Sequence, residues 1–256
     1  MLFWKKTKKI TLRCLTTTEM LPQLFPIVRL SKALPTWWRG VPPYLDEEVA
    51  SAELKKRFNP FAPPKMAKTI KHCYAVQKLW ENSLVIPMWS DYCVTVLPDG
   101  KVGGAAPGLM HSGEHHPPSQ YPGMIGNDWM AWKITSPWVI FTEEPVSWFL
   151  SDPFYHNQDH RWMTMPGEIE FHYQHHSHIN AIFSKPPEGK GVKYQFNAGD
   201  AIAYLTPRFN RDIEIVCETI TESEKQKLDW AKKFSFNPAR WTRDSMKIGG
   251  CPLHRR

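Results

Sequence analysis

Four of the chain's eleven histidines fall within residues 172–178. Imidazoles at this density can bind a metal, sense pH or stack on a ligand. Polar and apolar residues alternate over 168–174, and if 168–180 is one β-strand its even-numbered side chains share one face. That face would carry four candidate metal ligands: Glu170, His172, His176 and His178. The alternative is that the run His175-His-Ser-His178 forms a turn between two strands.

The spacing of His176 and His178 suits a metal centre in a cupin-like barrel, because imidazoles two residues apart on a strand point the same way. Glu170 or His172 would complete the set, and two histidines with one carboxylate favour Fe(II), with another divalent metal as the alternative. Arg211 would then hold the carboxylate of a 2-oxo acid cosubstrate. These roles describe a mononuclear Fe(II) oxygenase. The competing interpretation is a solvated or hydrogen-bonded histidine face without metal.

Two further groups of histidines lie in predicted loops. One contains His156, Asp159 and His160, after Asp152-Pro153. The other contains His111, Glu114, His115 and His116, within the Gly- and Pro-containing span 103–126, which shows little periodicity and predicts a long loop. Each group is interpreted either as a contribution to a pocket near the first cluster or as a polar loop.

Tryptophan is abundant, with 12 in the chain, and Trp37-Trp38 is the informative pair. Neighbouring residues cannot both face one core, so one ring is expected to be exposed or held at an interface. We predict Trp37 and Trp38 as partner-binding residues. Lysines and arginines crowd both termini and contribute to the net charge of +7, so the termini offer a binding surface for nucleic acid. A binder of nucleic acid or carbohydrate, which would use Trp37 and Trp38 beside the basic N-terminal strand, is therefore a third hypothesis.

The elements that must position these residues are mostly strands. Alternation predicts strands at 8–15, 91–97, 129–134, 137–142, 145–150, 167–174, 178–184, 192–197, 200–206 and 211–220, and Pro98-Asp99-Gly100 and Gly199-Asp200 predict turns. Helices are predicted at 46–57, 67–82 and 222–233, with a Thr221–Glu224 capping box before the last.

This pattern predicts a mainly β fold, a jelly-roll or cupin-like β-sandwich with a few N-terminal helices and one C-terminal helix. We expect a single domain over 1–256. It would comprise a mixed helical and strand part (1–85), the β-sandwich (86–220) and a C-terminal helix with a basic tail (221–256).

Composition excludes several classes of protein. Five scattered cysteines without a CxxC pair argue against a disulfide framework and fit a reducing compartment. The N-terminus lacks a signal-peptide core, and no stretch approaches a membrane span, so we expect a cytoplasmic chain that is not secreted. Dinucleotide-binding, Walker and nucleophile-elbow motifs are missing from the sequence.

Several phrases, in this order, resemble an uncharacterised family of proteins of tailed phages of marine bacteria, with distant bacterial relatives. The phrases are Phe25-Pro-Ile27, Leu34-Pro-Thr-Trp-Trp38, Thr69-Ile-Lys-His-Cys73, Val85-Ile-Pro-Met-Trp-Ser-Asp91, Ser136-Pro-Trp138 and Phe196-Asn-Ala-Gly-Asp-Ala-Ile-Ala-Tyr-Leu-Thr-Pro207.

The resemblance implies a β-sandwich or jelly-roll body and a phage origin, but no activity, and the histidine run departs from the family pattern. The leading hypothesis is accordingly a non-catalytic binding or structural protein. Its partner would be a second copy of itself or another phage protein, either in the cytoplasm of an infected host cell or associated with the virion.

Overall fold

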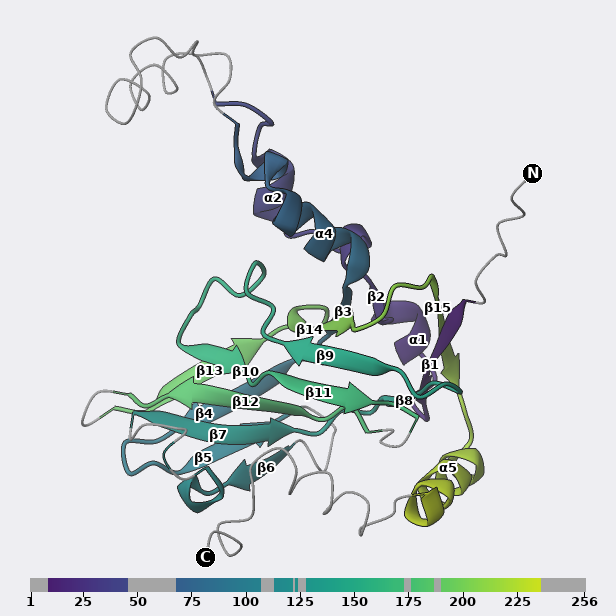
Figure 1. Cartoon of the computed structure of the whole chain (residues 1–256). Coiled ribbons are helices and arrows are strands. Elements are labelled where there is room, and N and C mark those ends of the chain that lie inside the picture. The colour runs from purple at the N-terminus through teal and green to yellow at the C-terminus, as the bar shows by residue number, and fades with distance from the viewer. Residues whose placement is uncertain are drawn as a thin grey trace, which may run out of the picture.

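The computed structural model describes residues 9–45, 68–106, 113–121, 123, 128–172, 176–186 and 190–235 (Figure 1). Within these ranges the chain forms four sheets and few helices, which confirms the predicted mainly β class. The jelly-roll or cupin-like topology remains a prediction. The helix predicted at 46–57 and the basic tail from residue 237 lie outside the described residues.

Each sheet combines strands that are distant in sequence. The first contains, in spatial order, β15 (Ile213–Thr219), β1 (Ile10–Thr16) and β8 (Val139–Phe141). The second contains β10 (Trp162–Thr164), β12 (Ile179–Ser184), β7 (Trp129–Ile134) and β6 (Gly113–His116). The third contains β11 (Gly167–Glu170), β9 (Ser147–Ser151), β14 (Ala201–Pro207), β3 (Leu84–Pro87) and β2 (Val28–Arg29). The fourth contains β13 (Val192–Phe196), β4 (Tyr92–Val96) and β5 (Val102–Ala105).

The first sheet joins the beginning and the end of the body. β1 and β15 run parallel, from Ile10 opposite Ile213 to Thr16 opposite Thr219, whereas β8 pairs with β1 in the antiparallel direction. Ile10 and Leu12 of β1 are buried in the main core, which therefore depends on contacts between sequence-distant strands. Such contacts must offset a large loop-closure entropy before they stabilise the fold.

Alternation along the strands builds the main core. In β12 the residues Ile179, Ala181 and Phe183 are fully buried while the residues between them are half-buried, as a period of two requires. Trp138 and Trp148 are also fully buried, so these two tryptophans fill the interior.

One buried hydrogen bond links the second and fourth sheets. Trp132 on β7 donates its indole N–H to the hydroxyl of Tyr92 on β4, at 2.8 Å. The two rings fit because Gly104 on β5 has no side chain: a Cβ there would lie 2.7 Å from Nε1 of Trp132 and would also collide with the Tyr92 hydroxyl. Gly103, its neighbour on the same strand, has open space at the corresponding position.

We therefore expect Gly104→Ala to lower the free energy of unfolding by about 1–3 kcal/mol, because an extra methyl group in a packed interior forces neighbours to move. Gly103→Ala is the matched control and should leave stability unchanged or slightly raised, since alanine suits a strand better than glycine does. Urea unfolding of the two variants measures the difference. Equal stabilities would contradict the packing described.

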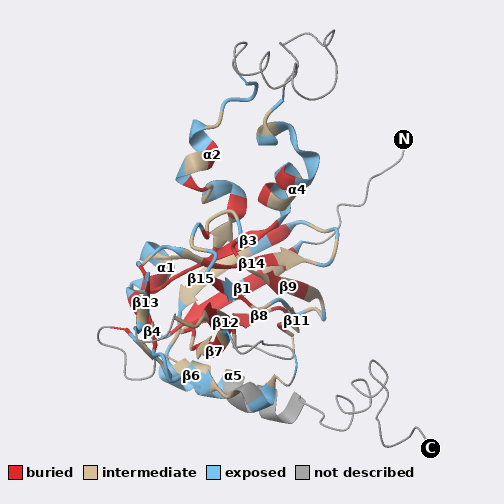
Figure 2. Ribbon diagram, turned by 90° about the vertical axis from the view of Figure 1, so that its left-hand side faces the viewer, coloured by how far each residue is buried: buried red, intermediate tan, exposed pale blue. Residues whose placement is uncertain are grey.

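A helical lobe, defined as residues 30–45 and 68–83, projects from the body (Figure 1). It contains η1 (Leu30–Lys32), α2 (Thr36–Gly40), η3 (Ile70–His72) and α4 (Tyr74–Asn82). A second apolar cluster holds the lobe to the body: Trp38 and Trp80 pack on Val85 of β3 and Tyr204 of β14. Figure 2 shows these buried segments at the base of the lobe, above β3 and β14.

The remaining helices are α1 (Leu21–Leu24), η4 (Pro118–Gln120) and α5 (Glu222–Ser235). The predicted capping box of α5 is confirmed, because the Glu224 carboxylate accepts from the Thr221 N–H and the Thr221 hydroxyl accepts from the Glu224 N–H. Turns at Gly100 and Gly199 are confirmed as well, and both glycines have positive φ. The helix predicted over 67–82 forms as η3 and α4, separated by Cys73.

Two interpretations of secondary structure are wrong. Residues 168–180 are not one strand: as the separate strands predicted at 167–174 and 178–184 indicate, β11 ends at Glu170 and β12 begins at Ile179, and the two belong to different sheets. The span 103–126 is not simply a loop, because β5 and β6 occupy parts of it. β5 pairs with β4, and β6 pairs with β7. These pairings make strands of residues whose own sequence shows little alternation.

Candidate functional site

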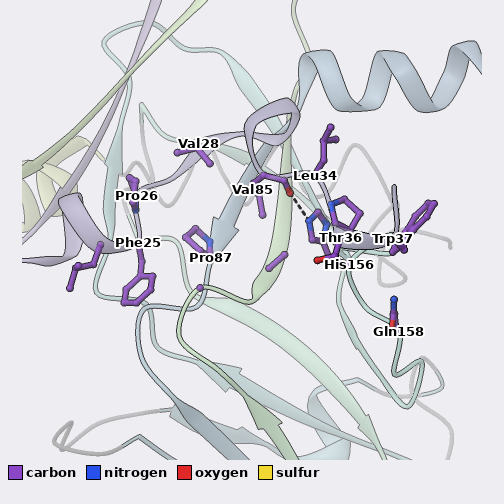
Figure 3. A pocket seen from close by; sticks show the side chains of 15 residues that line it. Phe25, Pro26, Val28, Leu34, Thr36, Trp37, Val85, Pro87, His156 and Gln158 are labelled. Atoms are coloured by element: carbon purple, nitrogen blue, oxygen red, sulfur yellow. Dashed lines mark hydrogen bonds between the residues drawn. The ribbon is translucent and has the colours of Figure 1, made fainter. Parts of the chain in front are cut away.

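A groove of about 600 Å³ lies where the lobe meets the body. Figure 3 shows Phe25 and Pro26 on one side, Thr36, Trp37 and His156 on the other, and Pro87 between them. Its walls come from five separate segments, around α1, α2, β3, β14 and the loop after β9. The volume lies within the range of about 300–1,000 Å³ that is typical of ligand sites.

Small and rigid residues keep the groove open. Ala201 lines it at a β-bulge, where the register between β14 and β3 shifts between Ala201 and Ala203. Bulges bend a strand and are common beside functional sites. Gly199, with φ of +91°, makes the preceding turn and lies against the ring of Phe25. Pro26 and Pro87 contribute walls with little side-chain entropy to lose on binding.

Trp37 and Trp38 differ in burial, as predicted for two adjacent residues. Trp38 is buried and its ring packs against Trp80, with centroids 5.2 Å apart. Trp37 is half-buried and lines the groove, and its indole N–H donates to the carbonyl of Tyr155 at 2.8 Å. Trp37 is therefore held in a fixed orientation with part of its surface facing the groove. A partner-binding role for the pair stays a prediction.

Among the described residues that line the groove, His156 alone has an ionisable side chain. Its Nε2 lies 2.7 Å from the carbonyl oxygen of Ala33 in the lobe, and its Nδ1 lies 2.6 Å from the hydroxyl of Tyr204 on β14. A carbonyl can only accept, so Nε2 carries the proton, and Nδ1 then accepts from the Tyr204 O–H. The imidazole thus connects lobe and body with both of its nitrogens.

The loop after β9 presents His156 in this position. Its first turn is closed by the N–H groups of His156 and Asn157, which both donate to the carbonyl of Pro153. Asp152 accepts from the Thr164 N–H at 2.8 Å, and the Asn157 side chain donates to the Trp162 carbonyl at 2.8 Å. Burial raises the pKa of the Asp152 carboxyl. The loop is therefore fastened at both ends, which turns His156 inward.

Burial keeps His156 neutral. It lowers the pKa of His156 below the ordinary value, and the hydrogen bond to the Ala33 carbonyl opposes that effect only in part. Burial also raises the pKa of Tyr204, so its hydroxyl remains protonated and able to donate. With both nitrogens engaged, this imidazole has no free nitrogen with which to serve as a base towards a molecule in the groove.

The neutral state of His156 predicts a pH effect on stability. As pH falls through 6.5, the unfolded imidazole takes up a proton that the folded one resists. The unfolded state then binds more protons, so this contribution to stability is complete above that pH and is lost as pH falls below it. In His156→Gln the difference in unfolding free energy between about pH 7.5 and about pH 5.5 should shrink.

At about pH 7.5 the same variant should lose about 1 kcal/mol through the missing bond to Tyr204. His160→Gln is the matched control, because His160 is exposed and stacks on Phe154. Urea unfolding at the two pH values provides the measurement. If His160→Gln reduces the pH dependence of the unfolding free energy as much as His156→Gln does, His156 is not the residue responsible for it.

The residues of the first histidine cluster do not share one face. Glu170, on β11, accepts a 3.4 Å bond from the Ser147 hydroxyl, and Nδ1 of His172 lies 3.2 Å from the Thr142 carbonyl. The rings of His176 and His178 stack, with centroids 5.1 Å apart, just before β12. The prediction that these four side chains line one strand face is therefore wrong, because the chain turns between β11 and β12.

The buried residue between the two stacked histidines explains their position. Ser177 is 2% exposed, and its Oγ lies 3.1 Å from the Ser136 hydroxyl and from the Trp138 carbonyl. The Ser136 N–H donates to Nδ1 of His178 at 3.2 Å. The segment is thus fastened to residues 136–138 by hydrogen bonds. Among the described residues, no group of three or more His, Cys, Asp or Glu side chains is placed to hold a metal.

The other two clusters lie in different surroundings. His160 stacks on Phe154, and the Asp159 carboxylate pairs with Arg161. His116, on β6, bonds to the side chain of Gln120. His111 lies outside the described ranges.

Glu114, the carboxylate of the third cluster, lies on β6 and forms an ion pair with Lys133. The pKa of Glu114 is lowered mainly by Lys133, whose Nζ lies 2.5 Å from the carboxylate, and less by His116 and His178. His115, between Glu114 and His116 on β6, is exposed.

Arg211 is engaged by a carboxylate of the chain itself. Its guanidinium forms a bidentate pair with Glu144, with N–O distances of 2.5 and 3.1 Å. Arg211 also lines a separate cavity of about 620 Å³, together with Arg29, Asn82 and Asp212. A 2-oxo acid would have to displace Glu144 to use both nitrogens of the fork, so its predicted cosubstrate role gains no support from this geometry.

Comparison with protein-family models, with curated proteins and with solved structures finds no match to this chain. No helix in the described part is long and apolar enough to cross a membrane. Sequence reasoning found Trp37 but missed the role of His156. The Asp152-Pro153 turn marks the start of its loop, but nothing local indicates that Ala33 and Tyr204 are its partners.

Proposed function

We propose that this chain is a non-catalytic binding protein, and that the groove and the surrounding lobe receive an apolar segment of a partner protein. The observation that carries the proposal is the chemistry of the groove wall. Apart from His156, its described lining side chains are apolar or uncharged, and they include three prolines and two aromatic rings. Both nitrogens of His156 are already bonded, so the wall favours recognition over acid–base chemistry.

The shape and rigidity of the wall suit an extended peptide. Pro26, Pro35, Pro87 and the fixed ring of Trp37 form a surface that loses little entropy on binding. Grooves lined by aromatic and proline side chains commonly accept extended segments, including those in the polyproline II conformation. Such an occupant would be held by apolar contact, with Thr36 and Gln158 available for hydrogen bonds.

Exposed apolar side chains extend this surface beyond the groove. Leu24, in the wall, is 59% exposed, and Phe154, whose ring contacts Tyr155 next to Trp37, is 60% exposed. Single exposed apolar residues are ordinary, but their presence in and around one groove is typical of an interaction site. These residues would form the rim against which the partner packs.

The proposal predicts that charge placed in the groove will weaken peptide binding. Peptides selected from a random displayed library against the wild-type chain should bind Leu24→Asp at least about tenfold more weakly, since the substitution puts a carboxylate against an apolar ligand. Leu97→Asp is the matched control, because Leu97 is 41% exposed beside the turn between β4 and β5. Fluorescence anisotropy with labelled selected peptides gives both affinities.

Two outcomes would contradict the proposal. One is a selection that enriches no peptide above background. The other is a set of enriched peptides whose affinity falls equally for Leu24→Asp and Leu97→Asp. Leu24 is largely exposed, so its substitution should leave folding intact, and a urea unfolding curve of each variant checks this.

A second candidate function, binding of single-stranded nucleic acid, is favoured by the charge of the lobe. Residues 30–45 and 68–83 contain one acidic residue, Glu81, and five basic ones: Lys32, Arg39, Lys68, Lys71 and Lys78. Lys78 pairs with Glu81, whereas Lys68 and Lys71 form no ion pair within the described part of the chain. Segment 46–67 adds four basic and four acidic residues and so no net charge.

Exposed rings accompany these cations. Tyr74 is 71% exposed, and the exposed ring of Tyr44 contacts His72 in a tilted geometry, with centroids 4.7 Å apart. Basic side chains interleaved with exposed rings are the two features that bind single strands without sequence preference. The nucleic-acid surface proposed here is the lobe, whereas the sequence pattern predicted the basic termini.

If the lobe binds nucleic acid, an oligothymidine of about 20 nucleotides should bind with strong salt dependence. Contact with four phosphates implies a loss of about fiftyfold in affinity between about 50 and about 200 mM salt. Lys68→Glu with Lys71→Glu should abolish most binding. Lys190→Glu with Lys193→Glu makes the same charge change on exposed body residues and should have a small effect.

Anisotropy titrations with the labelled oligonucleotide distinguish the cases. Equal losses for the two double variants would indicate general attraction to a chain of net charge +7 and would remove this candidate. Carbohydrate remains a possible ligand of the same rings, and we place it below nucleic acid because sugar recognition would not require the excess of cations.

From the resemblance to phage proteins we also propose that the chain acts in an infected cell or on a virion. Its partner would be a second copy of itself or another phage protein. The Fe(II) oxygenase hypothesis ranks lower. Its four candidate ligands are divided between the end of β11, the turn after it and the segment before β12.

A further inference from the structure

Two free thiols face each other across the seam between β1 and β15. Cys14 and Cys217 are partners in the parallel register, and neither forms a disulfide. Neighbouring strands lie about 4.7–4.9 Å apart, and disulfides join Cα atoms that are about 4.4–6.8 Å apart. As register partners in a parallel pair, their side chains lie next to each other on the same face of the sheet. A bond between the two sulfurs therefore requires only a small local adjustment.

The two thiols differ in access. Cys14 is fully buried, whereas Cys217 is half-buried and lines a cavity of about 330 Å³ together with Arg29 and Lys32. Sγ of Cys217 lies 3.7 Å from the Ile27 carbonyl. A reagent in this cavity would meet Cys217 first, and it would reach Cys14 only through Cys217.

The electrostatics of the cavity also favour reaction at Cys217 before Cys14. The adjacent Cys14 thiol lowers the pKa of Cys217, while burial and the charge of Glu218 oppose this effect. Burial raises the pKa of Cys14. Arg29 and Lys32 bring positive charge to the cavity wall, which favours an anionic reagent. Cys217 is therefore the better nucleophile and Cys14 the buried second thiol.

We propose that Cys217 is a modification site for a small anionic disulfide such as oxidised glutathione, and that Cys14 then completes a reversible Cys14–Cys217 disulfide. The thiolate of Cys217 attacks one sulfur of the glutathione disulfide, the bond between its sulfurs breaks, and one glutathione leaves as its thiolate. The Cys14 thiol loses its proton and attacks Sγ of Cys217, and the second glutathione leaves. Two protein thiols are oxidised to a disulfide, and one glutathione disulfide is reduced to two thiols.

The experiment treats the full-length chain with oxidised glutathione, blocks remaining thiols with N-ethylmaleimide and maps the digested peptides by mass spectrometry. The expected product is a peptide pair linked through Cys14 and Cys217, which dithiothreitol separates. Exposed Cys73 should carry a glutathione adduct in every sample, and it shows that the reagent was active.

Two variants separate the steps. Cys14→Ser should accumulate a stable glutathione adduct on Cys217, because the second thiol is missing. Cys217→Ser should leave Cys14 unmodified, because Cys14 has no other route to the reagent. In the wild-type chain, the oxidised form should also unfold at a higher urea concentration than the reduced form, since the new bond closes a very long loop.

The proposal is overturned if Cys217 of the wild-type chain is recovered with N-ethylmaleimide while Cys73 carries glutathione. It is also overturned if Cys217 stops at the glutathione adduct although Cys14 is present. The wild-type map alone gives these results, so the conclusion does not depend on the folding of either serine variant. It is equally independent of whether the groove binds peptides.

Discussion

The contact on which the candidate site depends is the neutral imidazole of His156, held between the Tyr204 hydroxyl and the Ala33 carbonyl. One partner belongs to the body and the other to the lobe, so this ring joins the lobe to the body at one side of the groove. The aromatic cluster of Trp38 and Trp80 excludes water from the same junction. In that environment a bonded neutral ring is stable, whereas an unpaired or charged one would be costly.

Local sequence patterns were sufficient for much of the body. Alternation located β7 and β12 to within one residue, since their side chains face a core on one side and a polar environment on the other. The turn at Gly199 and the cap at Thr221 were also predictable, because each depends on the chemistry of a few consecutive residues. The mainly β class follows from these signals.

Features that depend on distant partners were not predictable. The period of two stops at the polar run 175–178, but the sequence does not show that the chain leaves one sheet there and enters another. That change depends on residues 136–138, which hydrogen-bond Ser177. The sequence also did not predict β6, because this strand forms only through its pairing with β7. The site shows the same limit: Trp37 was identifiable as one of two adjacent rings, but the groove it lines requires four other segments.

The parallel seam between β1 and β15 has a consequence for synthesis in the cell. Leu12 and Ile10 lie among the first residues of the body to leave the ribosome, yet their neighbours in the sheet, Ile215 and Ile213, are translated about two hundred residues later. Until then a nascent chain carries an apolar strand whose parallel edge is unpaired, a form that is prone to association. The first sheet can close only after β15 has been translated, so the order of the strands delays its completion until most of the body has been synthesised.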